Sequence, residues 1–225
     1  MKISELFWLT YVSEYTTIDN VDYAFIEQDD TLLILFQGSN QVVDWLDNFN
    51  FPAKPYKHMD TVYYVHRGFL KCWKIVEDII VNKITEKDDK SNFKWNKIIV
   101  SGYSHGGALA MLCHECVWFW RPDIRDNCWS YAFEGPRVYW GWKVRKDLRE
   151  RWDHFILIRN HKDIVTKVPP LLFGYCHVGN LLHIGRYQCY KKVDIKPNIE
   201  CIKSHFPELV KESLEEIDFN IDFKK

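Results

Sequence analysis

Short runs of consecutive apolar residues recur along the chain and predict buried strands. They lie at Thr31–Phe36 (TLLILF), Lys97–Val100 (KIIV) and Phe155–Ile158 (FILI). Runs of leucine and β-branched residues without polar alternation are typical of strands covered on both faces, as in a parallel sheet. We therefore expect these segments to lie side by side at the centre of the fold.

Helical patterns lie between these runs. In residues 68–86 one helix face is apolar, and its members are Phe69, Trp73, Val76 and Ile80. Residues 106–120 are apolar nearly all round, which indicates a buried helix. Alternating strands and helices predict an α/β fold, with a mostly parallel central sheet and helices on both faces. We expect loops at 52–60 and 87–96 and a turn at Pro169–Pro170.

The length and the charge balance narrow the choice of partners. The 225 residues are 47% hydrophobic and 27% charged, which fits one globular domain over residues 1–225. The formal net charge is −1, so nothing in the composition favours nucleic acid, and no basic cluster suits anionic lipid. No stretch approaches the roughly 20 apolar residues of a membrane span. The composition leaves the oligomeric state open.

Cysteine usage favours a reducing compartment. The seven cysteines are odd in number and sparsely spaced, so free thiols are the simplest interpretation. The first 20 residues show no signal-peptide pattern, and we expect a cytoplasmic protein. The run Cys113–Cys116 (CHEC) lies inside the buried helical pattern and has no second ligand pair, so we expect core thiols there and no metal site.

Residues 101–110 read SGYSHGGALA and place a serine in a G-x-S-x-G pattern, Gly102 to Gly106. The glycines allow a strand to turn sharply into a helix with Ser104 at the tip. A nucleophilic serine in this pattern requires a strand before it and a helix after it. Both are predicted here, because the run KIIV precedes the pattern and the buried helix follows it. Ser104 is therefore the candidate nucleophile, and the alternative is a tight turn with an idle serine.

Further blocks follow in a characteristic order: LFQGSNQVVDWLDNFNF (35–51), VHRGFLKCW (65–73), FEGPRV (133–138), RNHKDIVTKVPP (159–170) and GYCHVG (174–179). Together with SGYSHGGALA they resemble the class 3 lipases, a branch of the α/β-hydrolases, over about residues 5–207. The resemblance implies an α/β-hydrolase fold and a Ser-Asp-His triad that needs no metal or cofactor.

The acid and the base must follow Ser104 in that order along the chain. Asp163 comes five residues after the FILI strand and lies in the block that holds the family's catalytic acid; Asp153 precedes the strand and lies at its wrong end. Three histidines lie beyond Asp163, namely His177, His183 and His205. The resemblance implies His205, because the family's catalytic histidine comes from a late loop of this kind.

The resemblance also implies an oxyanion hole and a lid. The backbone amides of Ser39 and His105 are the expected oxyanion donors, and Tyr103 is expected to line the substrate pocket. Residues 42–49 form a short amphipathic pattern at the position of the family's lid; its apolar members are Val42, Trp45, Leu46 and Phe49. The alternative is a helix packed permanently on the core.

These features predict a serine carboxylic-ester hydrolase acting on lipid acyl esters, as a triacylglycerol lipase does. The expected substrate is a lipid or another acyl ester. A membrane or a lipid-droplet surface is one place where the enzyme would encounter it. A phospholipase A1 or a small-ester esterase is the enzymatic alternative, and a non-catalytic lipase-like interaction module is the alternative from another class.

Overall fold

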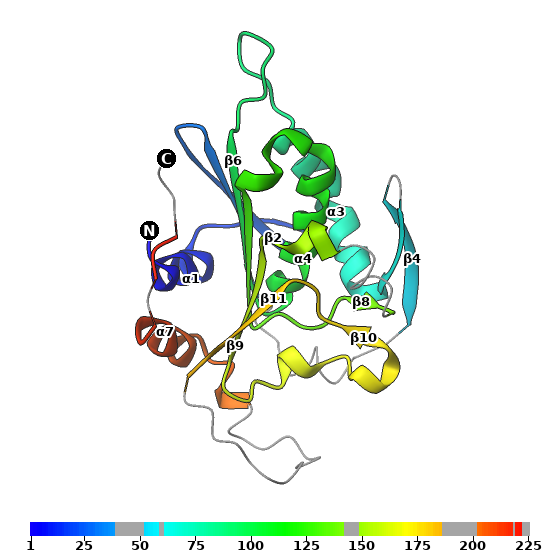
Figure 1. Ribbon diagram of the computed structural model, residues 1–225, viewed down its shortest axis with the longest axis vertical. Coiled ribbons are helices and arrows are strands. Elements are labelled where there is room, and N and C mark those ends of the chain that lie inside the picture. Colours follow the sequence, from blue (N-terminus) through cyan, green and yellow to red (C-terminus); the bar gives the residue numbers. More distant parts are fainter. Residues whose placement is uncertain (39–51, 59–60, 142–148, 186–201, 218, 222–225) are drawn as a thin grey trace.

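The computed structural model describes residues 1–38, 52–58, 61–141, 149–185, 202–217 and 219–221. Its centre is a seven-stranded sheet in the order β1-β2-β3-β6-β7-β9-β11 (Figure 1). The strands are β1 (Thr16–Ile18), β2 (Val21–Gln28), β3 (Thr31–Phe36), β6 (Lys97–Tyr103), β7 (Cys128–Phe133), β9 (Phe155–Asn160) and β11 (Asn180–Ile184). The five strands from β3 to β11 are parallel, and β1 and β2 pair antiparallel at one edge. The predicted parallel sheet is confirmed.

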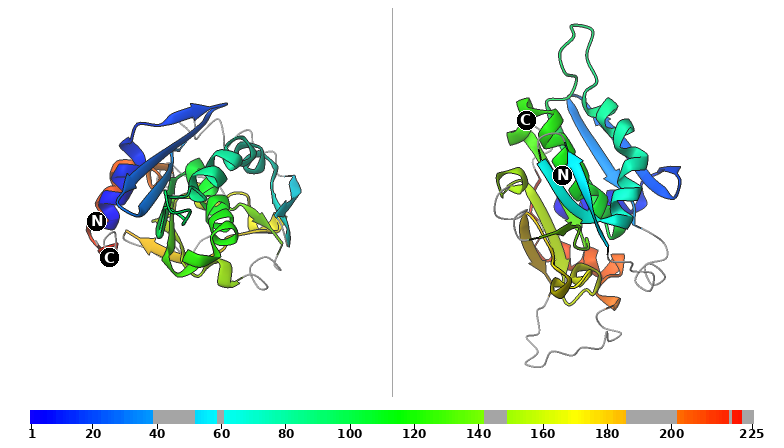
Figure 2. Two further views of the ribbon diagram at one scale, coloured as in Figure 1. Left: turned by 90° about the horizontal axis from the view of Figure 1, so that it is seen from above. Right: turned by 90° about the vertical axis from the view of Figure 1, so that its right-hand side faces the viewer.

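The helices cover both faces of this sheet (Figures 1 and 2). One face carries α1 (Ile3–Val12) and α7 (Pro207–Glu215), and the other carries α3 (Arg67–Ile84) and α4 (His105–Trp120). The apolar stripe predicted for 68–86 is the buried face of α3. The helix predicted at 106–120 is α4, and it is buried from Gly106 to Val117.

The run TLLILF shows why its apolar residues do not alternate with polar ones. Leu32, Ile34 and Phe36 pack into the core beneath α3 and α4. Leu33 and Leu35 pack into the second core, beneath α1 and α7. Because successive side chains of a strand point to opposite faces, a strand covered on both sides is apolar at every position.

A second sheet departs from the sequence prediction. Residues 52–60 were expected to form a loop, but β4 (Ala53–His58) pairs antiparallel with β5 (Thr61–His66). The sheet is completed by β8 (Tyr139–Trp140) and β10 (Tyr175–Cys176) in the order β10-β8-β5-β4. Pro55 argues against a strand when the sequence is considered alone. It is tolerated because β4 is an edge strand, where a missing N–H need not break the hydrogen-bond ladder.

Tyr56 fastens this second sheet to α3. Its hydroxyl donates a hydrogen bond to Glu77 (2.6 Å) and accepts one from the indole N–H of Trp73 (3.1 Å). These contacts are invisible in the sequence of 53–58 alone, where Tyr56 stands between Pro55 and Lys57.

Short 3₁₀ helices complete the described part of the chain: η1 (Pro122–Asn127), η2 (Arg149–Trp152), η3 (Val165–Lys167) and η4 (Leu171–Phe173). Residues 87–96 form the expected connection, closed by an isolated β-bridge between Lys87 and Phe93 and by a backbone hydrogen bond from Asp88 N–H to Asn92 O (2.8 Å). None of the helices within the described ranges is both long enough and apolar enough to cross a membrane.

Candidate active site

Ser104 stands at the turn between β6 and α4. Its φ is 56°, a conformation that residues other than glycine rarely adopt, and its backbone N–H donates to Phe133 O (2.8 Å). The neighbouring glycines are required by contact distance. A Cβ on Gly102 would lie 2.1 Å from Gly106 O, and one on Gly106 would lie 2.2 Å from Phe36 O. The G-x-S-x-G pattern therefore reflects backbone packed against backbone.

Gly106→Ala is expected to lower the free energy of unfolding by about 3 kcal/mol or more, because the new Cβ meets two backbone carbonyls that cannot move aside. Urea unfolding followed by tryptophan fluorescence measures the loss. Gly68→Ala is the matched control. That site is exposed in the first turn of α3 and meets only the ring of His66, so the change should stay within about 1 kcal/mol. Equal stability of the two variants would contradict this account.

The structure brings Ser104, His205 and Asp163 into one hydrogen-bonded chain. His205 Nε2 accepts from the Ser104 hydroxyl (2.8 Å), and His205 Nδ1–H donates to Asp163 Oδ2 (2.9 Å). Ser104 follows β6, Asp163 lies in the turn after β9, and His205 lies just before α7. All three side chains are buried. The arrangement contains a hydroxyl, a base to take its proton and an acid to orient that base.

Asp163 is held as an anion. Burial raises the pKa of its carboxyl, but the His205 charge and the hydrogen bonds from His205 and the Val165 amide lower it more, so the pKa ends below its ordinary value. The Val165 N–H donates to Asp163 Oδ1 at 2.9 Å. Both carboxylate oxygens therefore have donors, and the side chain is fixed toward the imidazole.

Arg137 secures the loop that carries Asp163. Its Nη1 donates to the carbonyls of Lys167 and Pro169, and its own backbone N–H donates to Val168 O (2.8 Å). The arginine of the FEGPRV block thus joins the segment after β7 to the segment after β9.

Tyr103 lies beside the triad histidine. It was expected to line the substrate pocket, but its ring is only 6% exposed and stacks on the His205 imidazole, with centroids 5.2 Å apart. Its hydroxyl donates to His205 O, and its other side meets Phe7 of α1. Because side chains alternate along β6, the residue before Ser104 faces α1 and α7. Tyr103 therefore supports His205.

The predicted oxyanion donors are only partly within the described residues. His105 is the first residue of α4, where backbone N–H groups have no partner within the helix and the dipole favours negative charge. Burial lowers the pKa of its imidazole to about 4, so the ring is neutral at pH 7. Ser39 lies outside the described residues. Its neighbour Gly38 packs against Ser104, because a Cβ added to Gly38 would lie only 3.1 Å from the serine Cβ. The predicted lid residues Val42, Trp45, Leu46 and Phe49 also lie outside the described ranges.

The other candidate histidines have different surroundings. His177 donates from Nε2 to Thr166 O (2.7 Å). His183 is exposed on β11, with Nε2 3.4 Å from Arg159 Nη1. Within α4, His114 bridges Ser130 Oγ and Arg151 O, both at 2.7 Å, and Cys113 and Cys116 are buried thiols. His205 is the histidine that the fold places at Ser104.

Sequence reasoning missed Glu134. It follows β7 directly, is fully buried, and offers a carboxyl oxygen within 4.8 Å of both Asp163 and His205. A signal was available, because Glu134 comes at the end of a parallel strand, as Ser104 does, and such strand ends meet at one edge of the sheet.

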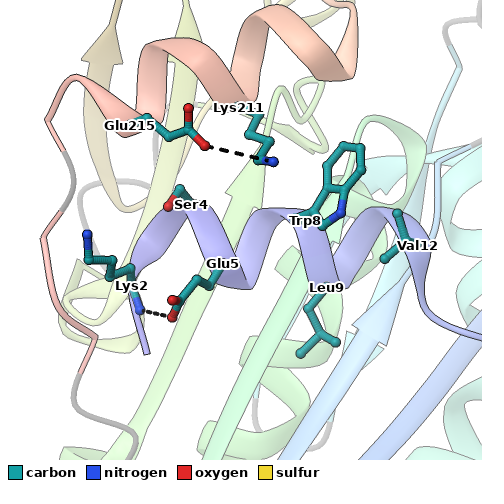
Figure 3. A pocket seen from close by; sticks show the side chains of 8 residues that line it. All are labelled: Lys2, Ser4, Glu5, Trp8, Leu9, Val12, Lys211 and Glu215. Carbon is teal, nitrogen blue, oxygen red and sulfur yellow. Dashed lines mark hydrogen bonds and ion pairs between the residues drawn. The ribbon is translucent and has the colours of Figure 1, made fainter.

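A surface groove lies elsewhere, between α1 and α7 (Figure 3), with a volume of about 580 Å³. Its floor includes Trp8, over which Lys211 Nζ lies 4.5 Å from the ring centroid. Neither Ser104, Asp163 nor His205 lines it.

Comparisons with known proteins identify a family for this chain. The family model described as Lipase (class 3) matches residues 33–173. The chain is 28% identical over 158 residues to a lipase of Rhizomucor miehei, covering 68% of this chain and 41% of that protein. The solved structure of the Rhizomucor miehei triacylglyceride lipase superposes with a TM-score of 0.66 at 24% identity, covering 76% of this chain and 64% of the other. A triacylglycerol lipase described as having a serine protease triad at its catalytic centre superposes with a TM-score of 0.64 at 25% identity, covering 77% and 65%.

These neighbours have the α/β-hydrolase fold, and so does this chain. The chain spans about two fifths of the length of the curated relatives it matches.

Proposed function

The chain belongs to the class 3 lipase family, and on that premise we propose that it is a serine carboxylic-ester hydrolase acting on lipid acyl esters. The observation that carries the proposal is the continuous hydrogen-bonded chain from Ser104 through His205 to Asp163. The same three types of side chain perform acyl transfer on several unrelated folds. A triacylglycerol lipase with a serine protease triad is among the structures similar to this chain.

In this mechanism the Ser104 Oγ attacks the ester carbonyl while His205 Nε2 takes the hydroxyl proton. Asp163 accepts from Nδ1–H and stabilises the imidazolium that forms. The His105 amide stabilises the tetrahedral oxyanion together with the predicted amide of Ser39, and one such donor is worth about 3–4 kcal/mol. His205 then protonates the leaving alcohol, and water repeats the cycle on the acyl-enzyme.

An exposed apolar segment supports a substrate at a lipid surface. Leu171, Leu172 and Phe173 form η4 and are 55%, 91% and 51% exposed. The segment begins eight residues after Asp163, and the indole N–H of Trp140 holds it by donating to Phe173 O (2.8 Å). Adjacent exposed leucine and phenylalanine side chains suit contact with acyl chains. We therefore include action at a membrane or lipid-droplet surface in the proposal. We also propose a cytoplasmic location, and the argument for it is the cysteine pattern of the sequence.

Hydrolysis of p-nitrophenyl esters of increasing acyl length tests the proposal. We expect turnover by the wild type and a rise in rate with chain length or above the concentration at which the ester forms an interface. Highest activity on acetate or butyrate would favour a small-ester esterase, and release of the sn-1 chain from phosphatidylcholine would favour a phospholipase A1. If the folded protein hydrolyses no ester, with or without detergent, the non-catalytic module is the better description.

A further inference from the structure

A second carboxyl stands at the acid end of the Ser104–His205–Asp163 chain. In the sheet, β7 lies between β6 and β9, so the residue that ends β7 lies between the strand ends that carry Ser104 and Asp163. That residue is Glu134. Both Glu134 and Asp163 are 0% exposed, and His205 is 4% exposed. Their carboxyl oxygens and a ring nitrogen lie within 4.8 Å of one another.

The backbone at Glu134 is unusual for a residue with a side chain. Its φ is 55°, a conformation in which glycine would be free of strain. Its N–H donates to Ile158 O at 2.9 Å, so the chain is held in this conformation from β9. Strained residues of this kind cluster at functional sites, where the surrounding structure fixes them.

The two oxygens of the Glu134 carboxyl differ. Oε1 accepts a hydrogen bond from the Asn160 N–H. Oε2 is buried and receives no hydrogen bond from an N–H or O–H group of the described residues. A buried anionic oxygen without a donor is costly, whereas the same oxygen bearing a proton can itself donate. The neighbouring Asp163 carboxylate can accept a hydrogen bond from such a proton.

Two neighbouring buried carboxyls cannot both ionise readily, so one of them keeps its proton. The surroundings of each carboxyl determine which one it is. Burial, followed by the negative charge of Asp163, raises the pKa of Glu134 well above its ordinary value. The other groups that face it are His205, Tyr103 and Arg159, and the positive charge of Arg159 opposes the rise without reversing it. Asp163 shifts in the opposite direction and remains the anion of the pair.

We propose that Glu134 is a positioning residue of this site: a neutral carboxylic acid that donates a hydrogen bond from Oε2 to Asp163 and thereby holds that carboxylate toward His205. The inference rests on the proposed hydrolase function. Asp163 then receives three donors, from the Val165 amide, His205 and Glu134. With Asp163 fixed and ionised, the His205 proton stays on Nδ1, and Nε2 stays free to accept from Ser104.

Two variants of Glu134 separate the donor from the charge. Glu134→Gln keeps the size and can donate to Asp163 while accepting from Asn160, so kcat should stay within about threefold of the wild type. Glu134→Gly adopts the same φ without strain but has no donor, and kcat should fall about tenfold or more with KM nearly unchanged, as expected for a lost charge-assisted hydrogen bond. Equal kcat for wild type and Glu134→Gly, or an equal loss in both variants, would overturn the positioning role.

The pH–rate profile gives a readout that mere packing would not change. If Glu134 is neutral, Glu134→Gln removes no charge, and the acid limb of kcat/KM should keep its position. If Glu134 is ionised instead, the variant removes a negative charge beside His205, and the acid limb moves to lower pH. A shift of that kind would contradict the proposal.

Thermal stability tests the protonation state without any turnover. A carboxyl whose folded pKa is raised contributes stability below its unfolded pKa, and this contribution is lost as pH rises toward the folded pKa. Glu134→Gln does not titrate. Its Tm relative to the wild type should therefore increase from about pH 4.5 upward and gain roughly 5 °C or more by pH 8. The Tm of Glu134→Gly relative to the wild type should rise with pH in the same way, starting from a different value at low pH. A Tm difference that stays flat or falls with pH would overturn the neutral acid.

The two proposals fail in different ways. If the wild type hydrolyses esters in a Ser104-dependent manner and Glu134→Gly matches it, only the positioning role fails. If the wild type hydrolyses nothing, the rate at which a fluorophosphonate probe labels Ser104 replaces kcat in the comparison of variants. Absence of both turnover and labelling would reject the hydrolase function and the positioning role with it.

Discussion

Ser104→Ala is expected to lower the turnover of a p-nitrophenyl ester by about 10⁵-fold, because removal of the nucleophile of a serine triad leaves only the catalysis due to binding and the oxyanion donors. The Ser104 hydroxyl is the group that His205 Nε2 contacts, at 2.8 Å. Initial rates of the purified wild type and variant, on the ester that the wild type hydrolyses best, measure the effect.

Ser101→Ala is the matched control for this result. Ser101 lies on the same strand, is equally buried, and shares a hydrogen bond with Thr10 Oγ1 (2.6 Å). Thr10 also donates to Leu6 O, so it keeps a partner in the variant. We expect Ser101→Ala to stay within about twofold of wild-type turnover. A fluorophosphonate should label the wild type and Ser101→Ala on the peptide that contains Ser104, and it should leave Ser104→Ala unlabelled. Residual activity of Ser104→Ala above about one tenth of the wild type would overturn the mechanism.

His205→Ala is the second large prediction, with turnover reduced by about 10⁴-fold or more. The imidazole is both the base for Ser104 and the partner that Asp163 orients. Its loss also leaves the buried Asp163 carboxylate without its main donor. The ester assay measures the rate, and urea unfolding reports how much of the loss follows from reduced stability.

His183→Ala is the control that distinguishes the sequence alternatives. His183 also follows Asp163 along the chain, but it is exposed on β11 and makes none of the contacts to Ser104 or Asp163 that His205 makes. Its variant should keep wild-type turnover. If His183→Ala were inactive and His205→Ala active, the assignment of the base would be wrong, because the two histidines would have exchanged roles.

The elements that bury one continuous face could be predicted from the sequence. The runs TLLILF, KIIV and FILI are strands because every position of a doubly covered strand is apolar. The helix α3 shows its stripe because only one of its faces packs against the core. By contrast, β4 was missed. Its residues are mostly polar, it carries Pro55, and it is a strand only because β5 and α3 supply partners distant in sequence.

The candidate site divides in the same way. The sequence by itself determined Ser104, because its glycines mark a local turn in which backbone meets backbone, and it pointed to Asp163 through the strand that ends just before it. Position along the chain left His177, His183 and His205 open, and the resemblance to the family implied His205. Only the tertiary structure decided that His205 meets Ser104, that Tyr103 supports this histidine and that Glu134 stands beside Asp163. Local patterns record the geometry of neighbouring residues, whereas a contact across 101 residues depends on how the sheet, α7 and their connections pack together.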